Sequence, residues 1–292
     1  MPGITQKLAI SFVRARINIL ALVSPGRAAK KAFAVFCTPR RRTRKKTPHI
    51  SGKSERLSFT LLGNTIRGHR WLPHQPSSSS PKKALLLHGF ESASANFGQY
   101  ISALLEKGYE VLAFDAPAHG RSEGKRITVP LYTQTIRTIS ERYGPIQSYM
   151  AHSFGGLALC LFLESMPADK RDKPDEPVRM ALIAPVSELV TAIDSFFQLL
   201  QLSPDIRREF DRLILEKSGF QPSHFSVRRA MDHISADTLW VQDEDDLITP
   251  LRDALLVKED QHPTIRFIIT RGLGHRKIYR DPGIVRQVVD FL

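Results

Sequence analysis

The stretch from Ile146 to Leu157, IQSYMAHSFGGL, places a serine where nucleophilic chemistry could take place. A short apolar run precedes Ser153, a helix-compatible run follows it, and the residues at positions 151, 155 and 156 are small. A sharp strand-to-helix turn requires small neighbours, because bulky side chains would clash around its strained central residue. Such a turn would lift the serine hydroxyl above a sheet and aim the N-terminus of the next helix at the attacked group. The alternative is that this Ser-x-Gly-Gly cluster only ends a buried strand.

Three other segments carry residues that could act together with this serine. The apolar run KALLL leads into His88-Gly89-Phe90, and the run TLWVQ leads into the four acidic residues 243–246. The last apolar run, TIRFIIT, leads into Arg271-Gly272-Leu273-Gly274-His275. A histidine can take the proton of a serine, and a carboxylate can hold the imidazole in the productive tautomer. Each segment also has a structural alternative. His88-Gly89 could only make a tight turn, residues 243–246 could form a solvated acidic turn, and His275 could be a surface residue. Most of the four acids must face water, because packed carboxylates repel one another.

In this chain order, the segments resemble the α/β-hydrolase fold family over residues 84–292. The order serine, acid, histidine of that family implies that Ser153, Asp246 and His275 form a catalytic triad. A hydrophobic-x-Pro turn usually follows the acid of the family, which favours Asp246 over Asp243 and Asp245. Ala151 replaces the usual first glycine of the nucleophile turn, and alanine still fits there.

The same resemblance implies an oxyanion hole made by the backbone N–H groups of Phe90 and Phe154. The loop DAPAHGRS, residues 115–122, also resembles a loop that follows the next strand in this family. We interpret this loop as architecture near the site and assign no role to His119.

Short apolar runs alternate with longer amphipathic segments through most of the chain, which predicts a mostly parallel, doubly wound sheet covered on both faces. Residues 56–73 predict an antiparallel hairpin with Gly63-Asn64 as its two-residue loop. Residues 188–237 predict a small helical cap within a hydrolase domain that spans residues 54–292. Apolar side chains at 196–202 could line an acyl pocket or pack the cap.

Residues 1–53 form a basic extension with thirteen Lys or Arg and no Asp or Glu. Ile10, Val13, Ile17 and Leu20 fall on one helical face, and Ser24-Pro25 predicts the start of a second helix. A spanning helix would place two arginines near the bilayer centre, at a cost of about 2.5 kcal/mol or more each. Three interpretations stay open: a helix on an anionic membrane surface, a helical arm packed on the body or a partner, and a mitochondrial transit peptide. The basic cluster beside an apolar helix favours the membrane surface through residues 1–46.

The remaining 29 basic and 29 acidic residues balance. A neutral body argues against nucleic-acid binding, which requires basic residues on the folded face. The two cysteines provide neither a disulfide framework nor metal-ligand spacing, so we expect a cytoplasmic protein, peripheral to a membrane if the extension binds one.

The residue chemistry and the resemblance together predict a serine hydrolase of the esterase or lipase type that needs no cofactor. Its expected partner is a small-molecule acyl ester, with thioester and amide bonds as alternatives. Two further alternatives are an acyltransferase on the same fold and a non-catalytic binding protein docked through the basic arm.

Overall fold

The computed structural model describes residues 4–40, 54–73, 81–167 and 178–292. Internal contacts divide the chain into two compact units. We call them the sheet unit, residues 39–187 and 227–292, and the helical unit, residues 1–38 and 188–226. Residues 41–46, which belong to the basic cluster of the N-terminal extension, lie outside the described residues.

The sheet unit is built on eight strands in the order β1-β2-β4-β3-β5-β6-β7-β8 within the described residues. The β1–β2 and β2–β4 pairs are antiparallel, and every pair from β4 to β8 is parallel. The predicted, mostly parallel sheet is therefore confirmed, and its central strand β5 leads into Ser153. The strands are β1 Ser54–Leu61, β2 Asn64–Trp71, β3 Lys83–Leu87, β4 Glu110–Phe114, β5 Ser148–His152, β6 Arg179–Ile183, β7 Asp237–Asp243 and β8 Ile265–Thr270.

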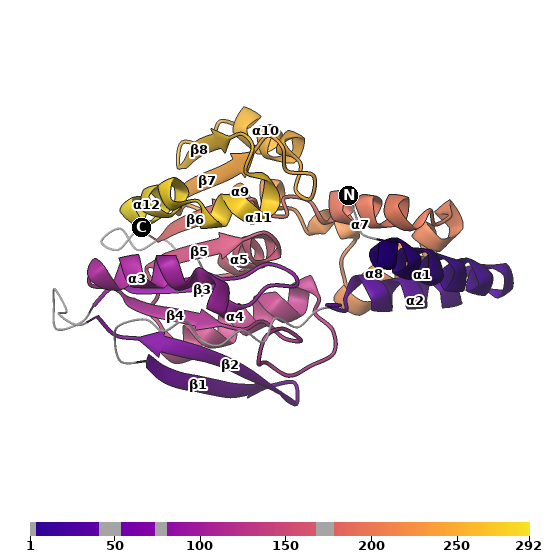
Figure 1. Cartoon of the computed structure of the whole chain (residues 1–292), viewed down its shortest axis with the longest axis horizontal. Coiled ribbons are helices and arrows are strands. Elements are labelled where there is room, and N and C mark those ends of the chain that lie inside the picture. Colours follow the sequence, from indigo (N-terminus) through magenta and orange to yellow (C-terminus); the bar gives the residue numbers. More distant parts are fainter. Residues whose placement is uncertain (1–3, 41–53, 74–80, 168–177) are drawn as a thin grey trace. The chain divides into compact units, whose positions relative to one another are not determined.

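Helices cover both faces of this sheet, as expected for buried parallel strands (Figure 1). Met150 of β5 belongs to a core cluster with side chains of α3 and α12, whereas the ring of the adjacent Tyr149 packs on Phe162 of α5. Successive strand residues point to opposite faces. Thus α3 and α12 share one face, and α5, which packs on α4, covers the other. These helices are α3 Gly98–Glu106, α4 Val129–Tyr143, α5 Phe154–Glu164 and α12 Pro282–Phe291.

The predicted hairpin forms, but its loop is Leu62-Gly63 and not Gly63-Asn64. Both loop residues have a positive φ, 46° and 74°, and Asn64 pairs with Leu61 in the ladder. The observed register places Phe59 opposite Ile66, and both side chains are buried. Gly63 thus occupies the second loop position, where glycine is commonly found in two-residue loops that require a positive φ at both residues.

The helical unit combines the two N-terminal helices with the two helices predicted as a cap. Ser24 caps α2 as expected, since its Oγ accepts a hydrogen bond from the Arg27 backbone N–H at 3.3 Å. The rings of Phe33 and Phe36 in α2 pack against Phe210 of α8, with centroids 5.7 and 5.8 Å apart. The N-terminal helices thus share one apolar core with α8. The helices are α1 Ile4–Val23, α2 Pro25–Phe36, α7 Leu189–Leu200 and α8 Pro204–Ser218.

The helical unit ends at Ser226, which forms an isolated bridge with Glu188. The sequence allowed Phe196 and Phe197 either to line an acyl pocket or to pack within the helical segment. Their rings belong to the aromatic cluster around Phe210. No helix in the described ranges is long and apolar enough to cross a bilayer. The sheet unit also holds α9 Val227–Met231, which packs on α5, α10 Leu251–Glu259 and the short α11 Gly274–Lys277.

Candidate active site

Ser153 lies between the end of β5 and the start of α5, in the strained backbone that the small flanking residues predict. Its φ of 56° and ψ of −123° fall in a region that non-glycine residues rarely adopt. A Cβ added at Gly155 would lie 2.8 Å from the carbonyl oxygen of His88. Glycine therefore allows the first turn of α5 to approach the end of β3, and this approach holds the serine at the edge of the sheet.

His275 and Asp246 form a hydrogen-bonded chain with this serine. His275 Nε2 lies 2.9 Å from Ser153 Oγ, and His275 Nδ1 lies 2.8 Å from Asp246 Oδ2. The three side chains come from the loops after β5, β7 and β8, whose carboxyl ends meet at one edge of the sheet. The structure therefore brings together all three residues that the sequence selected.

Asp246 is buried and fully engaged. Its Oδ1 accepts the backbone N–H groups of Ile248 and Thr249, at 2.8 and 3.0 Å, and its Oδ2 also accepts the Thr249 hydroxyl at 2.7 Å. Burial by itself would raise the pKa of Asp246, but the hydrogen bonds and charge of His275 and the bonds from Thr249 outweigh it, so that the pKa falls below its ordinary value. Asp246 can thus stay ionised opposite an imidazolium.

The competing acids hold the loop that carries His275. Asp243 accepts hydrogen bonds from the Thr270 hydroxyl at 2.7 Å and from the backbone N–H groups of Leu273 and Gly274, at 3.1 and 2.9 Å. Asp245 accepts the Gly272 N–H at 3.0 Å. These two carboxylates point to the loop backbone, and Asp246 is the one that reaches the imidazole.

The loop after β3 passes directly beside the serine. A Cβ added at Gly89 would lie 2.7 Å from Ser153 Cβ and 3.2 Å from Ser153 Oγ. The N–H of Phe154, the first residue of α5, has no acceptor within the helix. Among the described residues, the N–H of Phe90 has no hydrogen-bond acceptor. The two donors that the resemblance implies thus come from loops that meet at Ser153.

A buried polar network fixes the shape of this loop. The Tyr132 hydroxyl donates to the His88 carbonyl at 2.9 Å, and His88 Nε2 accepts the Ala116 N–H at 2.9 Å. His119 Nε2 accepts the Glu91 N–H at 3.0 Å. Burial lowers the pKa of His88, which keeps the ring neutral and able to accept this bond.

Sequence reasoning assigned no role to His119, yet it holds the residue after Phe90. Its ring is buried, and its Nδ1 donates to the Pro117 carbonyl at 2.9 Å. The interacting residues His119 and Glu91 lie 28 positions apart in the sequence. No local pattern marks such a contact, so tertiary structure was needed to find it.

His152, the residue before the serine, was also missed. Its Nε2 donates to the carbonyl oxygen of His275 at 3.1 Å, and its ring packs against the rings of His275 and Tyr279, with centroids 4.8 and 4.3 Å away. Burial and the nearby charge of His275 lower the pKa of His152 to about 3, so the ring is neutral. It therefore supports the backbone of His275 without competing for the proton on the His275 ring.

Together these groups can perform acyl transfer. His275 can take the proton of Ser153 as the hydroxyl attacks a carbonyl, and Asp246 can stabilise the resulting imidazolium. Backbone N–H donors can bind the negative charge that develops on the carbonyl oxygen, because they need no ionisation and little rearrangement.

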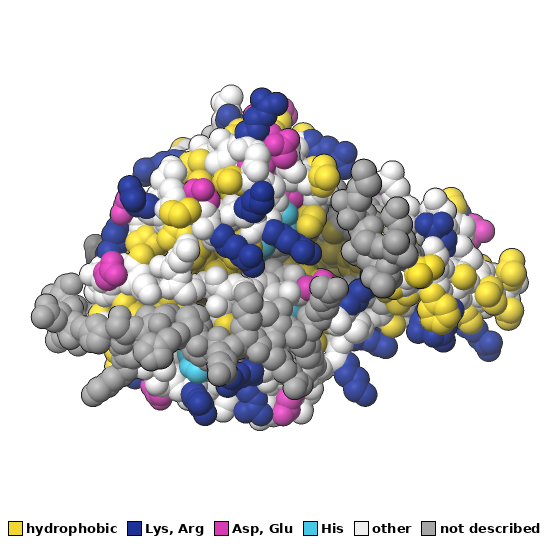
Figure 2. Space-filling model, viewed as in Figure 1, with side chains coloured by type: hydrophobic (Ala, Val, Ile, Leu, Met, Phe, Trp, Pro, Cys, Tyr) yellow, Lys and Arg dark blue, Asp and Glu magenta, His cyan; other side chains and the backbone are white. Residues whose placement is uncertain are grey.

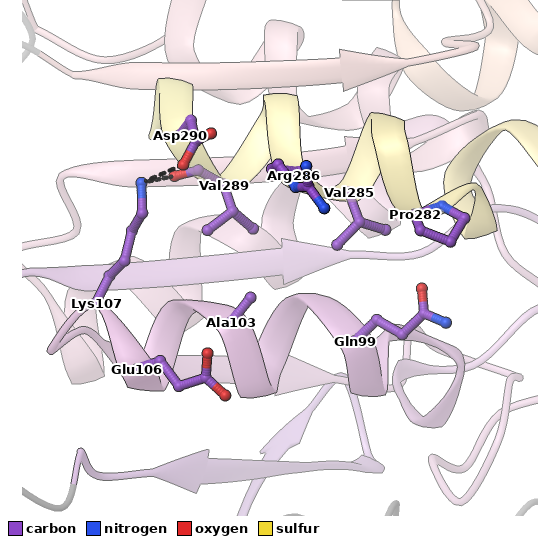
Figure 3. A pocket seen from close by; sticks show the side chains of 9 residues that line it. All are labelled: Gln99, Ala103, Glu106, Lys107, Pro282, Val285, Arg286, Val289 and Asp290. Carbon is purple, nitrogen blue, oxygen red and sulfur yellow. Dashed lines mark hydrogen bonds and ion pairs between the residues drawn. The ribbon is translucent and has the colours of Figure 1, made fainter.

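A surface cavity of about 430 Å³ lies elsewhere, between α3 and α12 (Figure 3). Lys107 at its rim is already paired with Asp290 at 2.9 Å. The cavity contains none of the residues around Ser153, so we do not connect it with the chemistry. Its lining consists of Gln99, Ala103, Glu106, Lys107, Pro282, Val285, Arg286, Val289 and Asp290.

Solved structures with the same fold include several hydrolases. An esterase from Pyrococcus furiosus superposes with a TM-score of 0.62 at 19% identity, covering 88% of this chain and 98% of that one. Est1E from Butyrivibrio proteoclasticus, solved with ferulic acid bound, gives 0.64 at 17% identity, covering 80% of this chain and 97% of that one. A thioesterase domain from the curacin biosynthetic pathway gives 0.57 at 15% identity, covering 81% and 99%.

Curated protein sequences contain no match to this chain. Residues 79–243, more than half of the chain, match the family described as Serine aminopeptidase, S33. The match includes Ser153 and the loop after β3, and it ends at the last residue of β7. With the sheet order and the strand-to-helix serine turn on the same residues, the chain belongs to this family of α/β hydrolases.

Proposed function

We propose that the protein is a serine hydrolase that cleaves carboxylic esters through an acyl-enzyme on Ser153. One observation carries the proposal: the imidazole of His275 lies between Ser153 Oγ and Asp246 Oδ2, within hydrogen-bond distance of both. This arrangement gives the serine a base and gives the base an orienting carboxylate, as nucleophilic catalysis at neutral pH requires.

In the first step, Ser153 Oγ attacks the ester carbonyl carbon and its proton passes to His275 Nε2. The N–H groups of Phe90 and Phe154 bind the oxyanion, and the tetrahedral intermediate collapses as His275 returns the proton to the departing alcohol. In the second step, water loses a proton to His275 and attacks the acyl-enzyme, which releases the carboxylic acid and restores the Ser153 hydroxyl.

The scissile bond is proposed to be an ester, with thioesters and amides as the bonds to compare. One of the structural relatives is named an esterase and another a thioesterase domain, whereas the family description names an aminopeptidase. A thioester or ester releases a better leaving group than an amine, so the same site should turn over these substrates faster than an aminoacyl amide.

A fluorophosphonate probe tests the nucleophile directly, because it reacts only with an activated serine. We expect mass spectrometry to find the adduct on Ser153, and we expect Ser153→Ala to abolish both labelling and hydrolysis of p-nitrophenyl acetate and butyrate. Ser165→Ala, at the end of α5, serves as the control and should behave like wild type. If wild-type protein neither labels nor turns over any of the three bond types, a binding protein on this fold explains the chain better.

Acyl transfer to an alcohol is the closest alternative, since it shares every step up to the acyl-enzyme. Product analysis in the presence of added alcohols separates the two reactions. If the main product in water is a new ester of the added alcohol, the protein is an acyltransferase and not a hydrolase.

A further inference from the structure

Helix α1 has two apolar faces, and only one of them has a partner inside the helical unit. Ile10 and Ile17 are buried, as the sequence pattern predicts for that face. The opposite face is apolar but open to solvent. Its exposed side chains are Leu8 at 65%, Phe12 at 63%, Ile19 at 63%, Leu22 at 88% and Val23 at 75%.

These five side chains, which we call the α1 ridge, fall on one stripe of the helix because their spacing of four, seven, three and one follows the helical repeat. A helix that is apolar on two faces is normally covered on both. Single exposed apolar residues are ordinary, but a continuous stripe marks an interaction surface. The α1 ridge is therefore a candidate interaction surface.

One basic side chain lies beside the ridge, and others are exposed on the neighbouring helix. The Arg16 guanidinium stacks over the ring of Phe12, 5.6 Å from its centroid. Arg27 and Lys30 are exposed on α2, which packs against α1. Hydrophobic and Lys or Arg side chains are also seen together on the surface of this unit in the space-filling view (Figure 2).

These cations have no acidic partner in the described part of the chain, where no carboxylate lies within 4.0 Å of Arg16, Arg27 or Lys30. The acids of α7 and α8 are already paired with arginines of α8. Those pairs are Arg207 with Asp194 and Asp211, Arg208 with Asp205, and Arg212 with Glu209 and Glu216. The basic groups around the ridge are therefore available to an external anion.

We propose that the α1 ridge docks the protein on an anionic lipid bilayer, with α1 lying in the plane of the interface. The apolar stripe would enter the boundary between headgroups and acyl chains, and Arg16, Arg27 and Lys30 would contact lipid phosphates. Arg14 and Arg16, in the middle of α1, make a spanning orientation costly. A second copy of the chain fits the ridge less well, because pairing two ridges would bring two sets of unpaired cations together.

Co-sedimentation of the full chain with vesicles tests this proposal. We expect binding to vesicles of equal phosphatidylcholine and phosphatidylglycerol, and little binding to phosphatidylcholine alone. Added salt should weaken binding, because it shortens the Debye length to about 3 Å at 1 M. Combined Arg16→Glu, Arg27→Glu and Lys30→Glu should reduce the partition coefficient by at least about fivefold per residue. The control reverses three exposed cations of the sheet unit: Lys125→Glu, Arg126→Glu and Lys258→Glu.

The apolar contribution is tested by Phe12→Ser combined with Leu22→Ser. Both side chains are exposed, so the unit should stay folded, and binding should fall roughly tenfold per side chain. Leu247→Ser, at a position 95% exposed in the sheet unit, is the matched control and should bind as wild type does.

A fluorescent probe reports insertion independently. Cys37 and Cys160 are both buried, so a Leu22→Cys variant can be labelled selectively with an environment-sensitive dye. We expect a blue shift with anionic vesicles only. Equal binding to neutral vesicles, no effect of the α1 substitutions, or no blue shift would overturn the proposal. If sedimentation velocity shows a dimer that Phe12→Ser and Leu22→Ser dissociate, the ridge is a contact between copies instead.

Discussion

Replacing Asp246 or Asp243 by asparagine should separate the proposed catalytic carboxylate from the structural one. Each carboxylate accepts four hydrogen bonds, but their partners differ. Asp246 Oδ2 serves His275 and the Thr249 hydroxyl, whereas both oxygens of Asp243 serve the loop that carries His275.

At position 246, the carbonyl oxygen of asparagine would keep the two backbone N–H donors, so its NH₂ group would face His275 Nδ1. Donation to Nδ1 forces the proton onto Nε2, and Nε2 can then no longer accept the proton of Ser153. In a serine protease the same substitution lowers kcat by about 10⁴, which corresponds to ~5.5 kcal/mol of transition-state stabilisation. The Thr249 hydroxyl can rotate and accept the second N–H of the amide, so the melting temperature should change little.

At position 243 we expect the opposite result, a loss of stability with little loss of activity. The carbonyl oxygen of asparagine can keep the two hydrogen bonds of one carboxylate oxygen. Its NH₂ group replaces the other oxygen and cannot accept the two hydrogen bonds made there. Two hydrogen bonds to a charged acceptor contribute ~1.5–3 kcal/mol each. The loss of about 3 kcal/mol or more would lower the melting temperature by roughly 5 °C or more, given an unfolding entropy of ~2.1 cal/mol/K per residue. The kcat of the folded fraction should stay within about tenfold of wild type.

Two assays on purified variants read these effects: kcat on p-nitrophenyl butyrate at low temperature, and thermal unfolding followed by circular dichroism. The expected pattern is a catalytic loss without a stability loss for Asp246→Asn, and the opposite for Asp243→Asn. The assignment of the acid is wrong if Asp243→Asn abolishes turnover at an unchanged melting temperature while Asp246→Asn remains active.

Four further results are expected. Gly89→Ala should lower kcat by about 10² or more, because the new methyl group would press on Ser153 and displace the oxyanion loop; wild-type kcat in this variant would contradict the placement of that loop. His119→Phe removes the acceptor of the Glu91 N–H and should lower kcat by about tenfold with KM nearly unchanged, whereas His119→Gln, which can accept the same bond, should recover most of the loss; equal losses in both would make the role merely spatial. The folded-state pKa values of Asp243 and Asp246 lie below their ordinary values, so the stability that they contribute is present above about pH 4 and is lost as pH falls through the folded-state values; acid titration of unfolding should therefore be shallower in Asp243→Asn than in wild type. Deleting residues 1–38 removes the ring contacts of α2 on Phe210 and should lower the soluble yield and the melting temperature; a soluble, equally stable truncated protein would show that the helical unit does not need these helices.

The sequence by itself determined the parts of this protein that depend on neighbours along the chain. Apolar runs predicted the strands β3, β5, β7 and β8, which lead into the candidate site, and small residues around Ser153 predicted the strained turn. The order of Ser153, Asp246 and His275 selected three residues that the structure places within hydrogen-bond distance. Strand period, turn sterics and chain order are local or linear properties, so they can be followed along the sequence.

Tertiary structure decided what depends on partners distant in the sequence. The pairing of β1 with β2 places the hairpin loop one residue earlier than its sequence indicated. The contacts of His119 and His152 with backbone groups of other loops gave these residues roles that no spacing indicates.

The N-terminal helices show the same limit. Their periodicity indicated an apolar face but not its partner, and the structure gives that face to the core of α7 and α8 while a second apolar face stays exposed. Burial of apolar surface is non-directional, so a sequence pattern can show that a face needs cover without showing what covers it. That choice depends on shape and charge across the whole folded chain.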